Sequence, residues 1–311
     1  MDLGTLYLVP TPIGHRDDIT LRALEVLRHV PVMAAEDTRH TRNLLRTLGI
    51  ELGQRRLLSY HDHVEATRSG TLLEALRRGD DVALLSDAGT PLVNDPGYRV
   101  VAGAIAEGIT VRPLPGASAT ITALIGSGLP VHRFYFLGFL PRKAAARQAE
   151  LGRIRDVDAT LIMFEAPHRI VDTLGDMLKV LGDRPAALAC NLSKPDESFI
   201  RGPLSGILDR LGSEDAVRGQ YTGVVGGCPD TTSDAARAQA ERLAASMLRH
   251  GADARVCREV VQEVTGLPRN QVYELVRQGQ KVTPAGAAPE SLRGTGRQPA
   301  SRPSAEERGA G

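Results

Sequence analysis

The first 114 residues alternate short apolar runs with segments of helical periodicity, and this pattern constrains the fold more than any other feature. The apolar runs, which are typical of buried strands, lie at 5–10, 32–35, 56–59, 82–85 and 110–114. Between them, apolar residues at helical spacing occur at 19–27, 41–48, 71–76 and 100–106. Strand–helix alternation of this kind predicts an α/β domain with a mostly parallel sheet and helices on both faces.

A second set of strands and helices follows, in a less regular order. Strands are predicted at 134–137, 160–164, 186–190 and 221–225, and helices at 144–154 and 170–181. The irregular order predicts a mixed sheet. We therefore expect an N-terminal α/β domain at 1–114 and a mixed α/β domain at 115–229.

The sequence pattern changes after residue 229, from alternating strands and helices to helices alone. A helix is predicted at 234–250, capped by Ser233, and two shorter helices at 254–264 and 268–278. The shorter helices resemble a helix-turn-helix, because Gly266 lies in the turn and Pro268 opens the second helix. This small helical module at 230–280 either touches nucleic acid or has a packing role. Residues 281–311 are rich in Gly, Pro, Ala, Ser and Arg without periodicity, which predicts a disordered tail.

Composition and charge place the protein in a broad class. Cys190, Cys228 and Cys257 show no C-x-x-C spacing, which indicates a reducing compartment and argues against structural zinc or disulfides. No basic region precedes an apolar stretch at the start, and no apolar run approaches the roughly 20 residues of a membrane span. We therefore expect a cytoplasmic protein without a membrane partner. The net charge of +1 does not by itself suggest a nucleic-acid partner, although arginines gather locally.

Loops rich in proline, glycine, acid or hydroxyl follow the predicted strands at 9–14, 36–39, 86–91 and 113–118. Ligands of open α/β sheets bind beyond the carboxyl ends of the strands. Each loop alone is explained by local structure, since Asp37 and Ser118 are good helix caps and Gly14 and Gly116 suit turns. Together the loops favour a ligand crevice.

Several common ligand motifs are missing from these loops. No G-x-G-x-x-G follows a strand, and the chain has neither a phosphate-binding P-loop nor a G-x-S-x-G elbow. His61, Asp62 and His63 alternate on a strand-like segment, so their side chains point to opposite faces, and no second His/Cys cluster accompanies them. We therefore expect no metal site. The loops suit a compact zwitterionic ligand.

Several blocks of the sequence form distinctive motifs, at 9–14 (VPTPIG), 34–41 (AAEDTRHT), 59–63 (SYHDH), 86–91 (SDAGTP), 94–98 (NDPGY), 138–143 (GFLPRK) and 164–169 (FEAPHR). Together they resemble the tetrapyrrole methylase superfamily, and within it the branch that methylates small-subunit ribosomal RNA. The resemblance runs from residue 4 to about 280 and implies two α/β domains with a donor cleft between them, plus a small C-terminal helical module. It also implies a homodimer with S-adenosyl-L-methionine as methyl donor.

The implied reaction is 2′-O-methylation of a cytidine ribose in the decoding region of 16S rRNA, within the assembled 30S subunit. The resemblance places the donor pocket at Pro12, Asp87, Ala88, Gly89, Thr90, Ser118, Ala119, Phe164, Glu165 and Ala166. The candidates for the general base, among which the sequence does not choose, are Glu36, Asp37, His61 and Asp87. The residues assigned to RNA binding are Arg39, Arg42, Arg142, Lys143 and Arg147.

The chain departs from the family pattern at four positions. Cys190-Asn191 stands where the family has Arg-Glu, Gln220 where it has Glu, and His15 where Asn is usual. An arginine paired with two carboxylates can be lost as a unit without leaving a buried charge. The other interpretation is a silenced paralogue that binds rRNA or the donor without turnover. A third interpretation is methylation of a tetrapyrrole or another small molecule. Residues 36–41 and the basic Arg142-Lys143 segment favour RNA over a small molecule as the substrate.

Overall fold

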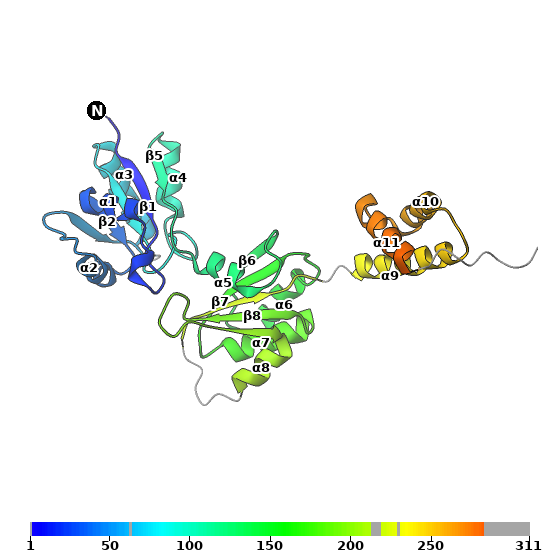
Figure 1. Ribbon diagram of the computed structural model, residues 1–311. Helices are drawn as coiled ribbons and strands as arrows, with labels where there is room; N and C mark the ends of the chain where they lie inside the picture. Colours follow the sequence, from blue (N-terminus) through cyan, green and yellow to red (C-terminus); the bar gives the residue numbers. More distant parts are fainter. Residues whose placement is uncertain (1, 62–63, 213–218, 229–230, 283–311) are drawn as a thin grey trace, which may run out of the picture. The chain divides into compact units, whose positions relative to one another are not determined.

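The computed structural model describes residues 2–61, 64–212, 219–228 and 231–282 (Figure 1). Asp62, His63 and most of the tail predicted at 281–311 lie outside the described residues. The chain divides into two compact units, Met1–Pro229 and Asp230–Gly311. Across the described ranges, no helix is both long and apolar enough to cross a membrane.

The first sheet has five parallel strands in the order β3-β2-β4-β1-β5. The strands are β1 (Thr5–Val9), β2 (Val32–Ala35), β3 (Arg56–Ser59), β4 (Val82–Leu85) and β5 (Thr110–Pro113). The predicted parallel sheet is confirmed. All its carboxyl ends meet at one edge, and the proline-, glycine- and acid-rich loops begin there.

Helices cover both faces of this sheet. They are η1 (Arg16–Asp18), α1 (Leu21–His29), α2 (Thr38–Thr47), α3 (Glu65–Arg77) and α4 (Tyr98–Ala106). Because successive strand residues point to opposite faces, Ala34 and Leu84 pack in the core with residues of α3 and α4. Met33 and Ala83 pack in the core with residues of α1 and α2. Burial on both faces explains why the central strands β2 and β4 are continuously apolar.

The second sheet is mixed, as predicted, with the order β6-β7-β10-β8-β9. Its strands are β6 (Phe134–Phe139), β7 (Thr160–Glu165), β8 (Pro185–Cys190), β9 (Ser198–Pro203) and β10 (Tyr221–Val225). β6 and β7 are parallel to each other. β10 is antiparallel to both β7 and β8, and β9 is antiparallel to β8. Its helices are α5 (Ala119–Ser127), α6 (Ala144–Arg153), α7 (Ile170–Leu181) and α8 (Leu204–Gly212). Ile162 of β7 faces α5, and its neighbour Met163 faces the core shared with α6, α7 and α8.

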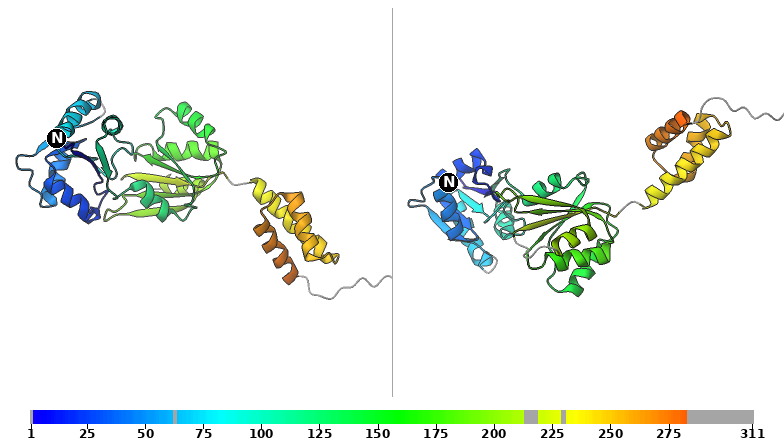
Figure 2. Two further views of the ribbon diagram at one scale, coloured as in Figure 1. Left: turned by 90° about the horizontal axis from the view of Figure 1, so that it is seen from above. Right: turned by 60° about the horizontal axis from the view of Figure 1, so that its bottom comes forward.

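The second unit is a bundle of three helices, α9 (Thr231–Arg249), α10 (Ala254–Thr265) and α11 (Arg269–Val282) (Figure 2). It has a core of its own, in which Ala244, Cys257 and Val276 are buried. Gly266 ends α10 in the left-handed conformation at φ 67°, the role that glycine commonly has at this position. The capping role of Ser233 is wrong, because α9 begins at Thr231 and Ser233 lies inside the helix.

Candidate functional site

The loops after β1 and β4 are joined by their backbones at the carboxyl edge of the parallel sheet. Thr11 and Gly89 exchange two backbone hydrogen bonds, with N···O distances of 2.9 and 3.0 Å. The buried Thr11 hydroxyl donates to the carbonyl of Ser86 at 3.1 Å. The Ser86 hydroxyl in turn donates to the carbonyl of Gly89 at 2.8 Å. These bonds fix the path of both loops.

The β4 loop also bonds to the loops after β2 and β5. The Thr90 hydroxyl donates to the carbonyl of Ala117, in the loop after β5, at 3.0 Å. The backbone amide of Asp37, in the loop after β2, donates to Asp87 Oδ1 at 3.1 Å. The structure therefore brings together the loops that the sequence pattern selects, with the β4 loop at their centre.

Gly89 is required by the shape of this cluster. Its φ of +84° lies in the left-handed region, and a Cβ built on it would lie 3.2 Å from Ile13 Cγ2 and 3.6 Å from the Ala117 carbonyl oxygen. A Cβ on Gly116 would lie 2.5 Å from Pro10 Cβ. Glycine at these positions lets the loop backbones approach each other closely.

The start of α5 carries a polar group that suits a ligand. Ser118 is the N-cap of α5, and its hydroxyl accepts from the Ile121 amide at 3.5 Å. Thr120, in the first turn, is 6% exposed, and its Oγ1 is buried without a hydrogen-bond partner in the part of the chain that the structure describes. A buried hydroxyl without a partner costs about 1–3 kcal/mol. The residues beside Ser118 and Ala119 thus fit a bound ligand with a polar group.

The four candidate bases lie at the carboxyl ends of the neighbouring strands β2, β3 and β4. Asp37 caps α2, where its Oδ1 accepts from the backbone amides of Arg39 at 2.8 Å and His40 at 3.4 Å. The Arg39 amide in particular holds the pKa of Asp37 below its usual range. Because a low pKa weakens a base, Asp37 suits capping better than proton abstraction.

The other candidate bases have different surroundings. Glu36 is exposed directly after β2. Half-buried Asp87 accepts from the Asp37 amide, so these two acids are neighbours. His61 is half-buried, and its backbone carbonyl accepts from the Val64 amide. The identity of the base stays a prediction.

The end of β7 has a different character from the loops of the first sheet. Glu165 is 2% exposed, and its Oε2 accepts from the Thr173 hydroxyl at 2.7 Å and lies 3.2 Å from Arg169 Nη2. Its Oε1 accepts from the Ala166 amide at 2.9 Å. These contacts hold the carboxylate within the second domain. Nearby, the Phe164 ring packs edge-on against Phe136 and Phe139.

The predicted RNA-binding residues separate into two groups. Arg39, Arg42, Arg142 and Lys143 are exposed. Arg147 is only 4% exposed, and its Nε and Nη2 lie 2.6 and 2.5 Å from Asp176 Oδ2. The assignment of Arg147 to RNA is therefore wrong, because its guanidinium is buried and joins α6 to α7.

Two contacts between the α/β domains were not predicted. The backbone amide of His15 donates to Ser193 Oγ at 3.0 Å, and Ser193 Oγ also bonds to Asp18. A Cβ on Gly14 would lie 2.5 Å from the backbone carbon of Ser193. Gly138 lies similarly close to the side chain of Asn94. Gly14 in a loop and Gly138 in β6 were the available signal, although a single sequence does not say which segment approaches them.

The residues that depart from the family pattern lie together. Asn191 lies in the left-handed conformation at φ 52°, and its Oδ1 accepts from the backbone amide of Gln220 at 3.0 Å. Its Nδ2 donates to Asp196 Oδ2 at 2.6 Å. Lys194 Nζ donates to Gln220 Oε1 at 3.1 Å. Positions 191 and 220 are thus direct neighbours, joined here by neutral amide groups.

Comparisons with known proteins agree with this architecture. The family model Tetrapyrrole (Corrin/Porphyrin) Methylases matches residues 5–208. The chain is 63% identical over 274 residues to ribosomal RNA small subunit methyltransferase I of Micromonospora olivasterospora, covering 88% of this chain and 87% of the relative. It is 42% identical over 283 residues to the protein of that name from Pseudomonas aeruginosa, covering 90% and 99%.

Among solved structures, diphthine synthase is similar in fold alone, with a TM-score of 0.56 and 18% identity over 72% of this chain and 90% of that chain. The family match covers both α/β sheets, apart from the last strand β10. The chain belongs to the tetrapyrrole methylase family and, within it, to the group of ribosomal RNA small subunit methyltransferase I.

Proposed function

We propose that this protein transfers a methyl group from S-adenosyl-L-methionine to the 2′-hydroxyl of a cytidine in the decoding region of 16S rRNA. The observation that carries the proposal is the cluster of loops joined around Gly89, in a chain of this family. The names of the relatives supply the small-subunit rRNA as substrate class. The cytidine and its 2′-hydroxyl come from the family resemblance of the loop motifs.

The loop residues would hold the donor, which supplies a methyl group already activated by its sulfonium. Pro12, residues 87–90 and residues 118–119 would surround it, and the Thr120 hydroxyl would gain the partner it lacks. The Phe164 ring and the backbone of residues 164–166 would complete the pocket from the second domain, while the Glu165 carboxylate stays with Thr173 and Arg169. Alignment of the reacting atoms accounts for much of the rate in such a site.

The ribose hydroxyl needs a base, which Glu36, His61 or Asp87 would supply more readily than Asp37. Exposed Arg39 and Arg42 of α2 lie close in sequence to Glu36 and Asp37 and would contact phosphates. Exposed Arg142 and Lys143 would do the same. Their segment is fixed by Arg169, whose Nη2 donates to the carbonyls of Leu140 at 2.8 Å and Pro141 at 3.2 Å.

We also propose that two copies of the chain form a dimer in the cytoplasm. Large apolar side chains are exposed on α4, α5 and β6, including Tyr98 at 76% and Ile125 at 70%. Exposed apolar residues that adjoin in one large patch mark interaction surfaces, and contact between two copies would cover them. Light scattering should give a dimer for the parent and a monomer for Ile125→Glu. A monomeric parent would contradict this.

The function is tested by incubating the protein with methyl-labelled donor and naked 16S rRNA, 30S subunits or a precorrinoid. We expect label on a cytidine ribose, with 30S subunits as the better substrate because local arginines favour a preformed RNA shape. Label on the macrocycle would instead make the protein a small-molecule methyltransferase. Donor or RNA binding without label in any arm would make it a silenced paralogue.

A further inference from the structure

Three acidic residues of the helical module pair with arginines of the same helix. Arg237 and Glu241 lie 3.4 Å apart on α9, Arg255 and Glu259 lie 3.2 Å apart on α10, and Arg277 and Glu274 lie 3.4 Å apart on α11. Such pairs leave little net charge where they occur. Positive charge on the module therefore comes from the arginines outside these pairs.

Two of those arginines lie in a groove between α10 and α11. The groove has a volume of about 420 Å³, and we define it by Arg255, Arg258, Gln262, Arg269 and Tyr273. Its acidic member, Glu259, is the partner of Arg255. Among the described residues of the module, Arg258 and Arg269 form no ion pair. The α10–α11 groove is thus positively charged.

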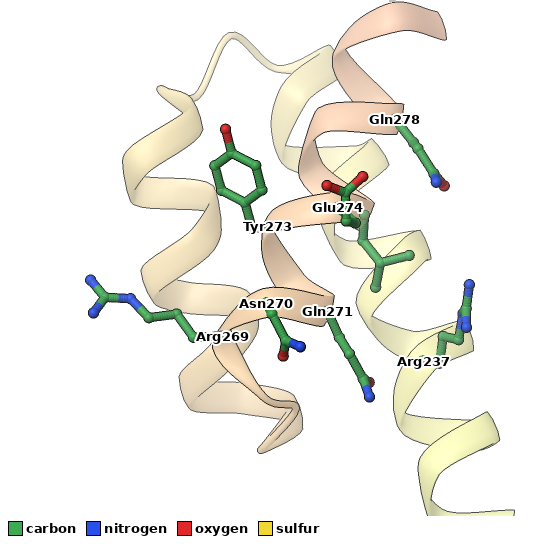
Figure 3. Close-up of a pocket in the computed structure, with 8 residues that line it drawn as sticks. Arg237, Arg269, Asn270, Gln271, Tyr273, Glu274 and Gln278 are labelled. Atoms are coloured by element: carbon green, nitrogen blue, oxygen red, sulfur yellow. The ribbon is translucent and has the colours of Figure 1, made fainter.

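An aromatic ring lies in the same groove. Tyr273 is 50% exposed, and the Arg258 guanidinium carbon lies 5.4 Å from its ring centroid. Figure 3 shows Arg269 and Tyr273 on the α10 side of α11, whereas Gln271 and Gln278 lie on the α9 side. No other aromatic residue occurs between 230 and 282 in the sequence. A core role does not explain so exposed a ring, because the buried residues of α11 are Val272, Leu275 and Val276.

Exposed rings beside arginines are the chemistry with which proteins hold single-stranded nucleic acid. Bases stack on the ring, and arginines contact phosphates. Gln262 adds donor and acceptor groups for a base edge. An acidic protein segment would use the charge but would leave the Tyr273 ring without a stacking partner. RNA is therefore the occupant that uses the whole groove.

We propose that the α10–α11 groove binds a single-stranded segment of RNA through stacking on Tyr273 and phosphate contacts to Arg258 and Arg269. The inference rests on the proposed function, since it gives the rRNA substrate a second contact surface outside the donor loops. The module would raise affinity for the RNA without taking part in methyl transfer.

The test is a fluorescence anisotropy titration of the full chain with a labelled single-stranded oligoribonucleotide. Tyr273→Ala should weaken binding about tenfold, and Tyr273→Phe should bind like the parent because it keeps the stacking ring. The double variant Arg258→Gln/Arg269→Gln should also lose about tenfold in affinity. The slope of log affinity against log salt concentration should become shallower by up to about 1.4, the value for two phosphate contacts to a single strand.

The matched control is Arg242→Gln/Arg249→Gln, which removes the same charge from exposed positions of α9. It should bind the oligoribonucleotide like the parent. Equal losses in the control would overturn the proposal, because only bulk charge would then matter. Unchanged binding by Tyr273→Ala would also overturn it. So would a result in which the groove variants lose affinity for a poly-glutamate peptide and keep their affinity for RNA. Because Arg258 is half-buried, its replacement could unfold the module, which circular dichroism would show. In that case the single variant Arg269→Gln, at an exposed position, replaces the double variant in the titration.

A methylation assay separates this proposal from the proposed function. If the parent methylates 30S subunits, the groove variants should raise KM for subunits about tenfold and leave kcat and donor affinity unchanged. If the parent methylates no rRNA, the proposed function fails, and the anisotropy series still decides whether the groove binds RNA. A fall in kcat with KM unchanged would overturn the proposal.

Discussion

The two α/β domains both end strands on polar residues, but they use those residues differently. In the first domain, the hydroxyls of Thr11, Ser86 and Thr90 bond to backbone carbonyls of the loop cluster. In the second, Glu165 and Arg169 bond to each other and to their own domain. The first arrangement fixes the paths of loops around small residues. The second arrangement fixes the loop after β7 through the buried ion pair between Glu165 and Arg169.

This difference assigns separate roles to motifs that look alike in the sequence. A motif residue in the first domain sets the shape of the ligand site, so its replacement should change donor binding. A charged motif residue in the second domain holds the structure, so its replacement should change stability first.

The largest effect on donor binding is expected for Gly89→Val. The new side chain would meet Ile13 and the Ala117 carbonyl at a φ of +84°, which pushes the joined loops apart. Overpacking of this kind costs about 1–3 kcal/mol, so donor affinity should fall about 10- to 100-fold in calorimetric titration. Affinity like that of the parent would place the donor elsewhere.

The control for Gly89 is Gly108→Val. Gly108 also has a positive φ, +70°, but a Cβ added to it would have no atom within 4 Å. This variant should lose stability of about 1–2 kcal/mol from backbone strain and keep its donor affinity. Equal losses of affinity in both variants would show that strain, and not contact with Ile13, is responsible.

Glu165→Ala should act on stability. It would leave the mostly buried Arg169 without its carboxylate and the buried Thr173 hydroxyl without its acceptor. Breaking a buried ion pair costs about 3–5 kcal/mol, which thermal melting will measure. Glu165→Gln, which keeps an acceptor for Thr173, should lose less. Loss of donor affinity at unchanged melting temperature would instead show that the carboxylate contacts the donor.

The parallel sheet was predictable because β2 and β4 are buried on both faces and therefore consist of unbroken apolar residues. β9 was missed because it is an edge strand with the sequence SFIRGP, in which few residues are apolar. α5 was missed because ATITALIGS is apolar around most of its surface and gives little helical periodicity.

The candidate site was predictable where it depends on local motifs and not where it depends on distant partners. The proline- and glycine-rich loops identified the carboxyl edge of the first sheet. Arg147 was misassigned because its local surroundings are basic, while Asp176, which buries it, comes from a later helix. The contact of His15 with Ser193 spans two domains, and no local pattern encodes it.

Smaller effects are expected where the chain departs from its family. Asn191→Glu alone should destabilise by about 1–2 kcal/mol, because it strains a left-handed residue and places a second carboxylate beside Asp196. Gln220→Glu alone should change stability by less than about 1 kcal/mol through an exposed pair with Lys194. Adding Cys190→Arg to both should recover stability and raise methyl transfer if the three form a network.

Melting temperature and methylation rate of all single, double and triple variants form a mutant cycle for this network. We expect strong non-additivity, because Asn191 Oδ1 accepts from the backbone amide of residue 220, so the two positions are adjacent and new charges on their side chains would interact. Additive effects would mean that the positions act independently. A triple variant no more active than the parent would mean that the neutral residues do not limit activity.

The smallest effect is expected for Asp37→Asn, which separates capping from catalysis. The pKa of Asp37 is lowered in the folded protein, so its ionisation stabilises the fold above the unfolded value of about 3.9, and this contribution is lost as the pH falls through the folded pKa. Asparagine keeps a capping oxygen and removes the titration. The melting temperature of the variant should therefore fall less steeply below about pH 4 than that of the parent.

Asp183→Asn is the matched control, since the backbone amide of Ser205 lowers the pKa of Asp183 in the second domain. Both variants should keep methyl transfer at neutral pH, whereas loss of a general base costs about 10²- to 10⁴-fold. A loss of that size in Asp37→Asn alone would make Asp37 the base and would show that a capping carboxylate of the first domain also does chemistry.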